Sequence, residues 1–181
     1  MLWPLMNVPA TLERTGPSRL KAVLKWLVGG GVVLAAALQL TNPALTNPPV
    51  VPGHDVLATN PPPPEIAILL RSACYDCHSD ETQWPWYSHV APVSWWLDGH
   101  VKDARKKLNF SEWPNDDPQR AAKKWNRVSE EVSSGDMPLP SYAWIHPMAR
   151  LSAGQREQLS KWADQEARRL QPGAASTSGQ P

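Results

Sequence analysis

The chain has 181 residues, with 18 basic and 17 acidic side chains and a formal net charge of +1. This length allows one modest domain with short extra segments, and the balanced charge provides no basic face, so nucleic-acid-binding classes are not expected. Twenty prolines and ten tryptophans accompany a single phenylalanine, which indicates a core of large flat side chains or packing around a large flat ligand.

The first predicted element is an apolar helix near the N-terminus. Four basic residues precede the apolar run WLVGGGVVLAAAL at 26–38: Arg14, Arg19, Lys21 and Lys25. A membrane-spanning helix needs about 20 apolar residues. Counted from Leu20, with the lysines reaching the interface, the stretch is long enough for a tilted span at about 20–40.

Residues 1–40 are therefore predicted to be a signal or anchor segment. The basic flank and short apolar region also fit a cleavable signal peptide, and we favour the uncleaved anchor. A buried core helix is disfavoured by three consecutive glycines. Whether the segment is an anchor or a cleaved signal peptide, its basic N-terminal flank is expected to stay in the cytoplasm and the residues after it to be exported. We expect a single-pass inner-membrane protein whose C-terminal domain lies in the periplasm.

The next segment, residues 41–64, carries eight prolines and little hydrophobic periodicity. Proline removes backbone donors and favours extended conformations. We predict a semi-stiff linker that contains a solvent-facing His54 and holds the following domain, residues 65–170, away from the membrane.

The first helix of that domain, EIAILLRSA, leads to the only two cysteines of the chain. Cys74 and Cys77 are followed directly by His78 in RSACYDCHSD. A Cys-x-x-Cys pair can shuttle a disulfide, and two cysteines with a histidine can begin a zinc site. Cys-x-x-Cys-His is also the attachment sequence of c-type haem, in which the cysteines form thioethers and His78 is the proximal iron ligand.

The haem interpretation agrees best with the rest of the chain. A thioredoxin-like redox site is expected near a βαβ pattern, which the sequence lacks, and zinc needs further ligands at suitable spacing. Haem c is attached outside the cytoplasm, and the predicted export would deliver the chain there. The predicted cofactor is one covalent haem c. The nearby acidic residues Asp76, Asp80 and Glu81 are predicted to form only a solvated turn.

Three longer helices follow the motif. The first covers 93–108, and one of its faces combines seven residues: Val93, Trp96, Leu97, His100, Val101, Ala104 and Leu108. The second begins after Asp117, a good N-cap, and ends near Gly135. The third begins at Ser152, which forms a capping box with Gln155, and ends near Leu170.

No strand alternation is present, so the predicted fold class is all-α. We expect a cytochrome c-like helical domain with long loops around the haem, because such loops would be unusual in an ordinary bundle. The tail at 171–181 is predicted to be disordered.

Iron bound by His78 has one axial position left, which methionine commonly closes in cytochromes c and thereby raises the potential. Met137, in SSGDMPLPSY, lies among prolines that stiffen its loop, and we predict it as the distal ligand. Met148 is a weaker candidate. Among the histidines, His100 is the main rival, followed by His89 and His146.

Other aromatic residues have two interpretations each. The tryptophans closest to the motif are expected to wall the ring or to pack in an ordinary core: Trp84, Trp86, Trp95 and Trp96. Tyr87 or Trp144 is expected to donate a hydrogen bond to a haem propionate, and His146 to bind a propionate or the backbone.

Three segments in order, CYDCHSDETQWPWYSHVAPVSWW, HVKDARKKLNFSEW and MPLPSYAWIHPMARLS, resemble the small bacterial haem-binding domain family over roughly 62–166. Members are exported, usually membrane-anchored proteins with one Cys-x-x-Cys-His motif. The resemblance implies that Cys74, Cys77 and His78 carry haem c. It matches Met137 to the family's methionine and His100 to a histidine before the NFSEW segment. Ala104 stands where the family pattern has glycine.

The predicted function is a monohaem c-type cytochrome domain that carries single electrons at the periplasmic face of the membrane, with no catalytic residues of its own. Its partners would be the membrane, through the N-terminal helix, and redox proteins in the periplasm or membrane. The alternative is a haem-based peroxidase or a gas or redox sensor with an open or weakly closed sixth iron position. A haem-free thiol–disulfide or zinc module is the third possibility.

Overall fold

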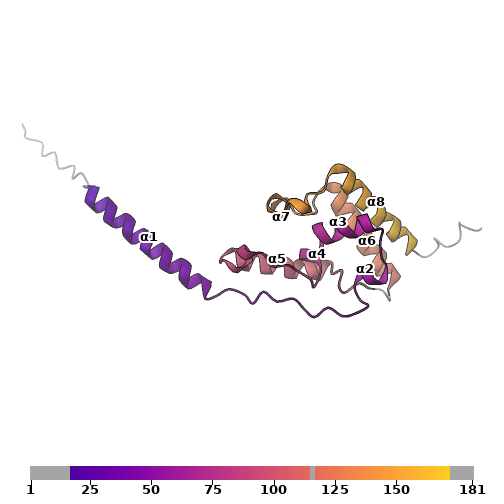
Figure 1. The fold of residues 1–181 in the computed structure, drawn as a ribbon, viewed down its shortest axis with the longest axis horizontal. Coiled ribbons are helices and arrows are strands. Elements are labelled where there is room, and N and C mark those ends of the chain that lie inside the picture. The colour runs from indigo at the N-terminus through magenta and orange to yellow at the C-terminus, as the bar shows by residue number, and fades with distance from the viewer. Residues whose placement is uncertain (1–16, 115–116, 172–181) are drawn as a thin grey trace, which may run out of the picture. The chain divides into compact units, whose positions relative to one another are not determined.

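The computed structural model describes residues 17–114 and 117–171, which fall into two units, Met1–Asn42 and Pro43–Pro181. Every regular element in these ranges is helical (Figure 1), which confirms the all-α fold class. Arg14 lies outside the described residues. So does the tail predicted to be disordered, except for Gln171.

The first unit contains helix α1, Pro17–Gln39. At 1.5 Å per residue its 23 residues extend about 35 Å, enough to cross the hydrocarbon core of a bilayer. None of its apolar window, Arg19–Gln39, is buried, whereas the core helix of a soluble domain is mostly buried. Its length and composition are those of a membrane anchor or a signal sequence.

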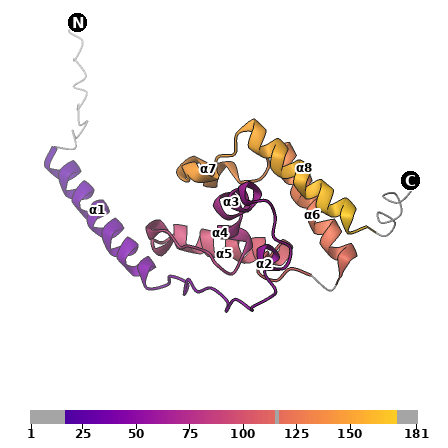
Figure 2. The ribbon, with the colours of Figure 1, turned by 45° about the vertical axis from the view of Figure 1, so that its right-hand side comes forward.

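The second unit is a helical domain whose elements are listed here in chain order: α2 (Val56–Thr59), α3 (Pro64–Ala73), α4 (Tyr75–His78), η1 (Trp86–His89), α5 (Val93–Lys107), α6 (Pro118–Ser134), α7 (Pro140–Ile145), η2 (Pro147–Ala149) and α8 (Ala153–Arg169). The four helices predicted in this part of the chain are all present. Helices α6 and α8 lie side by side in Figures 1 and 2, and α3 packs against α8 and α4.

Local signals at the helix ends explain why the longer helices were predictable. Asp117 accepts a hydrogen bond from the Arg120 amide at 2.9 Å and so caps α6. At the start of α8, the Ser152 hydroxyl accepts from the Gln155 amide and the Gln155 side chain accepts from the Ser152 amide. This confirms the capping box.

The core is built from aromatic side chains that face each other across α6 and α8. Trp125 is fully buried, with ring centroids 4.5 Å from Trp113 and 4.8 Å from Trp162. Phe110, also fully buried, stacks on Tyr75 at 5.3 Å. These rings pack together with aliphatic residues such as Ile66, Leu70 and Leu159 in one core cluster.

The predicted linker at 41–64 is wrong in its second half, because part of it belongs to the domain. Val56 is 1% exposed and lies in the core. Asp55 caps α2 through the Leu57 amide and accepts a hydrogen bond from the Tyr75 hydroxyl at 3.1 Å. Even Asn47 donates to the Thr82 carbonyl at 2.8 Å. The prolines indicated a free linker, but the cap formed by Asp55 and the burial of Val56 attach this segment to the domain. His54 is exposed, as predicted.

The predicted inner face of helix 93–108 is also only partly correct. Val101 is buried, whereas Val93, Trp96 and His100 are exposed. Ser94 is the buried residue of the first turn instead. The first half of α5 has η1 as its neighbour, so the small Ser94, and not the bulky residues around it, faces the protein.

Gly135 ends α6 in the left-handed conformation, with φ of 87°, and turns the chain towards Met137. Because a Cβ in this conformation meets the following carbonyl, we expect Gly135→Ala to lower the free energy of unfolding by about 1–2 kcal/mol. Urea unfolding followed by circular dichroism measures this loss. Gly154→Ala, in a helix and with open space around it, is the control and should be neutral or slightly stabilising. Equal effects would contradict the role of Gly135.

Candidate functional site

The motif residues are arranged by a single helical turn. Cys74 ends α3, where its amide donates to the Leu70 carbonyl at 2.9 Å. Its own carbonyl accepts from the amides of Cys77 and His78 at 3.1 and 2.9 Å. This short turn, α4, fixes the two sulfurs and the imidazole relative to one another.

The ring of His78 is oriented by the end of α5. Its Nδ1 lies 3.0 Å from the Leu108 carbonyl oxygen and 3.2 Å from that of Ala104. Carbonyls only accept hydrogen bonds, so Nδ1 carries the proton and Nε2 keeps its lone pair. Burial lowers the pKa of His78 and so favours the neutral ring. An oriented, neutral imidazole of this kind is a prepared metal ligand.

A cavity of about 420 Å³ opens beside His78 and brings together residues that are distant in the sequence. Cys74, His78 and Met137 all lie on its wall. The apolar part of the wall comes from five further residues: Ala73, Leu108, Phe110, Val128 and Val132. Cys77 lies within the single turn α4 and does not line the cavity.

Met137 reaches this cavity from a loop held at both ends. Its amide donates to the Glu131 carbonyl at 3.0 Å, and its carbonyl accepts from Arg156 at 3.3 Å. The other proposed distal ligands are elsewhere: Met148 is 78% exposed, and His100 is on the surface beside the Trp96 ring. The structure therefore places Met137, and not its rivals, on the same cavity as His78.

The mouth of the cavity is positively charged. Five basic residues line it, with the single acid Glu131: Lys107, Arg120, Lys123, Lys124 and Arg127. Lys124 donates to the Lys107 carbonyl, and burial and then the nearby Arg120 charge lower its pKa. An apolar cavity with a cationic mouth suits a flat apolar molecule that carries carboxylates. Four of these residues, at 120, 123, 124 and 127, share one face of α6 by helical spacing, which is a sequence signal for this basic face.

The two thiols lack the lowered pKa values that are typical of redox-active cysteines. Burial raises the pKa of Cys74 to about 12 and that of Cys77 to about 11, with Asp76 adding to the second shift. Thiol–disulfide exchange uses the thiolate, which lowered pKa values favour. Within residues 17–114 and 117–171 there is no group of three Cys, His, Asp or Glu side chains placed to hold a metal ion.

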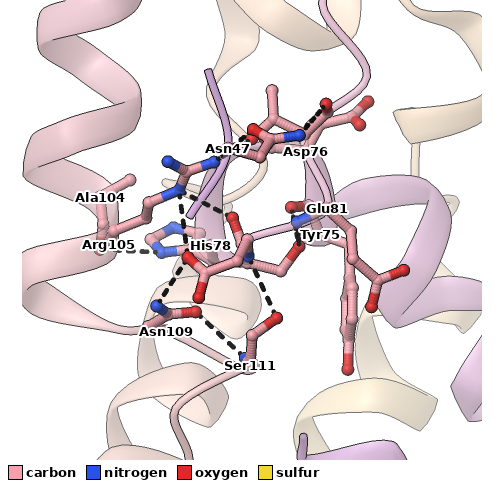
Figure 3. Close-up of polar contacts among 12 residues, drawn as sticks. Asn47, Tyr75, Asp76, His78, Glu81, Ala104, Arg105, Asn109 and Ser111 are labelled. Atoms are coloured by element: carbon pink, nitrogen blue, oxygen red, sulfur yellow. Dashed lines mark hydrogen bonds and ion pairs between the residues drawn. The ribbon is translucent and has the colours of Figure 1, made fainter. Parts of the chain in front are cut away.

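A polar network supports the chain directly after His78 (Figure 3). The Arg105 guanidinium donates to the Ser79 carbonyl at 2.8 Å and to Asn47 Oδ1 at 2.9 Å. It lies 3.7 Å from a carboxylate oxygen of Asp80, which also accepts from Asn109 at 3.1 Å. Asp80 is 4% exposed, so its assignment to a solvated turn is wrong. This network could not be predicted from the sequence, because its members come from three separate segments.

The other acidic residues near the motif behave differently. Asp76 accepts a hydrogen bond from the Tyr142 hydroxyl at 2.6 Å and another from the Gln83 amide. Glu81 is exposed and pairs with Arg71, as expected for a solvated turn. The Asp76–Tyr142 bond connects the motif to α7.

Removing the Arg105 side chain should destabilise the domain strongly. Arg105→Ala leaves the buried Asp80 carboxylate without its cation, and we expect a loss of about 2–4 kcal/mol in the free energy of unfolding. Urea unfolding of the full chain measures it. The control is the neighbouring Lys106→Ala, which removes only an exposed pair with Asp103 and should cost less than about 1 kcal/mol. Similar losses for both variants would contradict a structural role for the network.

Several residues expected around the cofactor lie away from the cavity. The Tyr87 hydroxyl and His146 Nε2 are 3.0 Å apart and hydrogen-bond to each other. Trp144 is 77% exposed and Trp86 is 80% exposed. Neither lines the cavity, whose basic lining residues are Lys107 and four residues of α6.

The chain was compared with known proteins. Residues 33–165 match the model of a family described as a haem-binding domain. The matched region runs from within α1 to within α8 and includes the motif, the cavity and Met137. No curated protein and no solved structure matches the chain.

Proposed function

The chain belongs to the haem-binding domain family, and on that premise we propose that it holds one haem covalently through Cys74 and Cys77 and carries single electrons. The observation that supports this most strongly is the cavity shared by Cys74, His78 and Met137. Haem when bound supplies a one-electron iron couple, and the protein determines its potential and its access.

The donor set of the cavity fits this group. His78 presents an unprotonated Nε2, because its Nδ1 proton is engaged by two carbonyls. Met137 offers a neutral thioether from a loop whose backbone is fixed on both sides. The apolar wall would contact the porphyrin ring, and the basic residues would neutralise its two propionates. Cys77, at the end of the same turn as Cys74, would form the second thioether.

Each protein ligand then has a separate task. His78, kept in one tautomer by the carbonyl at the end of α5, would bind the metal through Nε2. Met137 would be the second protein ligand, and its soft, neutral sulfur would favour the reduced metal and keep water and small molecules from it. The buried walls limit the change in solvation when the charge of the iron changes.

The proposed cellular location of the protein rests on helix α1. We assign α1 as an uncleaved anchor in the inner membrane, with the domain from residue 43 onwards in the periplasm, where haem c is attached. Redox proteins of the periplasm or membrane would be the donors and acceptors. The basic mouth provides a charged surface for such encounters.

Carbon monoxide binding distinguishes an electron carrier from a sensor or peroxidase. The haem-loaded full chain should give a reversible one-electron wave in voltammetry and bind carbon monoxide poorly, because Met137 occupies the sixth position. Its ferric spectrum should contain the far-red charge-transfer band of methionine-ligated haem. Rapid carbon monoxide binding together with absence of that band would instead establish an open sixth position, and the electron-carrier proposal would be withdrawn.

A further inference from the structure

The large apolar side chains that the domain leaves exposed are concentrated in two segments. Trp86, Trp96, Trp144, Ile145 and Met148, here called the tryptophan surface, are between 47% and 80% exposed. They come from η1 and the first turns of α5, and from α7 and η2. A monomeric soluble domain rarely exposes so many large apolar residues together, so this surface requires a partner.

The two segments are joined and held rigid. The hydrogen bond between Tyr87 and His146 connects η1 to the end of α7. Arg150 donates to the carbonyls of Ala143 and Trp144 and so fixes the backbone of α7. Figures 1 and 2 both place α7 and the beginning of α5 at the end of the domain away from α6 and α8. None of the five residues lines the cavity that contains His78.

The two segments that form this surface carry no charged side chains of their own, and the charged residue at their edge is Arg150, which donates to α7. The sequence has no Asp, Glu, Lys or Arg between Glu81 and Asp98, nor between Asp136 and Arg150. The cavity mouth on α6, in contrast, is lined by cations. Transient protein partners are usually steered by complementary charges, which these two segments do not offer. Tryptophan rings with uncharged surroundings are instead typical of the headgroup region of a bilayer.

The chain between α1 and the domain is too short to keep the domain away from a membrane. Asn47 is bound to the domain through Thr82 and Arg105, so only residues 40–46 separate that contact from Gln39, the end of α1. Seven fully extended residues span at most about 25 Å. A compact domain of this size has a radius of gyration of about 14 Å, so its width exceeds the tether.

We propose that the tryptophan surface lies in the headgroup region of the phospholipid bilayer in which α1 is anchored. The proposal rests on α1 being retained as an anchor, and it is independent of which residues ligate the haem. Contact at a second point would fix the orientation of the domain on the membrane and leave the basic mouth free for soluble partners.

Photolabelling from the lipid phase tests this surface. The full-length, haem-loaded chain is reconstituted into vesicles of phosphatidylethanolamine and phosphatidylglycerol with a trace of phosphatidylethanolamine whose headgroup amine carries a diazirine. After irradiation, mass spectrometry of peptides should find lipid adducts at 83–97 and 142–149, several-fold above those at Ile68. Ile68 is the internal control, because it is 64% exposed on α3 but not part of the surface. The variant Trp86→Ser/Trp144→Ser should lose most of the adducts while its visible spectrum is unchanged.

Four results would overturn the proposal. Adducts confined to α1 would show that the domain does not touch lipid, and equal labelling at Ile68 would show only random collisions. Loss of α1 from the mature protein, seen in its intact mass, would remove the anchor on which the proposal rests. If the surface instead crosslinks to a second copy of the chain, it is a dimer interface. A colourless sample, detected before irradiation, would contradict the proposed haem attachment and not the membrane contact.

Discussion

Replacing both cysteines, in Cys74→Ser/Cys77→Ser, is expected to abolish covalent haem completely. A serine hydroxyl does not form the thioether, so any haem bound through His78 would be extracted by acidified acetone. The single variants should each keep one thioether and show a haemochrome band shifted towards that of free protohaem. Intact mass spectrometry and the haemochrome spectrum of matured full-length protein measure both effects.

A substitution beside the motif provides the control for the cysteine variants. Ser72→Ala removes one hydroxyl, which donates only to the Leu69 carbonyl within α3, and it should retain the full haem content. Covalent haem that survives in the double cysteine variant would show that attachment does not use Cys74 and Cys77. An equal loss in Ser72→Ala would show that the cysteine effect is a general failure of folding.

Met137→Ala is expected to have the largest effect on the reduction potential. The loss of a soft, neutral ligand destabilises ferrous iron, and a fall on the order of 0.1 V or more is expected, because axial ligands set potentials over about 0.8 V. The far-red band of the ferric protein should disappear, and carbon monoxide should bind readily. Voltammetry and the ferric spectrum report these changes.

Two variants serve as controls for Met137. Met148→Ala removes a methionine that is 78% exposed, and His100→Ala removes a surface imidazole, so both should leave the potential and the far-red band unchanged. A fall in potential for His100→Ala with none for Met137→Ala would reverse the assignment of the distal ligand. It would also require α5 to rotate relative to the orientation described above.

Those features of the fold that depend on neighbours in the sequence were predictable. Asp117 and Ser152 are capping residues with adjacent partners, so the starts of α6 and α8 could be predicted from the sequence. The Cys-x-x-Cys-His motif is likewise contained in one turn of helix. The placement of Met137 followed from the glycine and prolines around it.

Features that depend on contacts between distant segments were not predictable. Asp80 looked like a surface residue, yet it is buried because Arg105 and Asn109 arrive from another part of the chain. His100 shares a face of α5 with buried Val101 by spacing, but only the second half of that helix packs on the motif. A hydrophobic pattern identifies a face but not how much of its length is covered.

Covalent attachment of haem is tested most directly by the haemochrome spectrum and intact mass of the full-length chain, expressed together with c-type haem maturation proteins. We expect the band position of a haem with both vinyl groups saturated, a mass increase of one haem, and no thiol that reacts with a labelling reagent. Colourless protein of unmodified mass, with both cysteines reactive, would contradict this account.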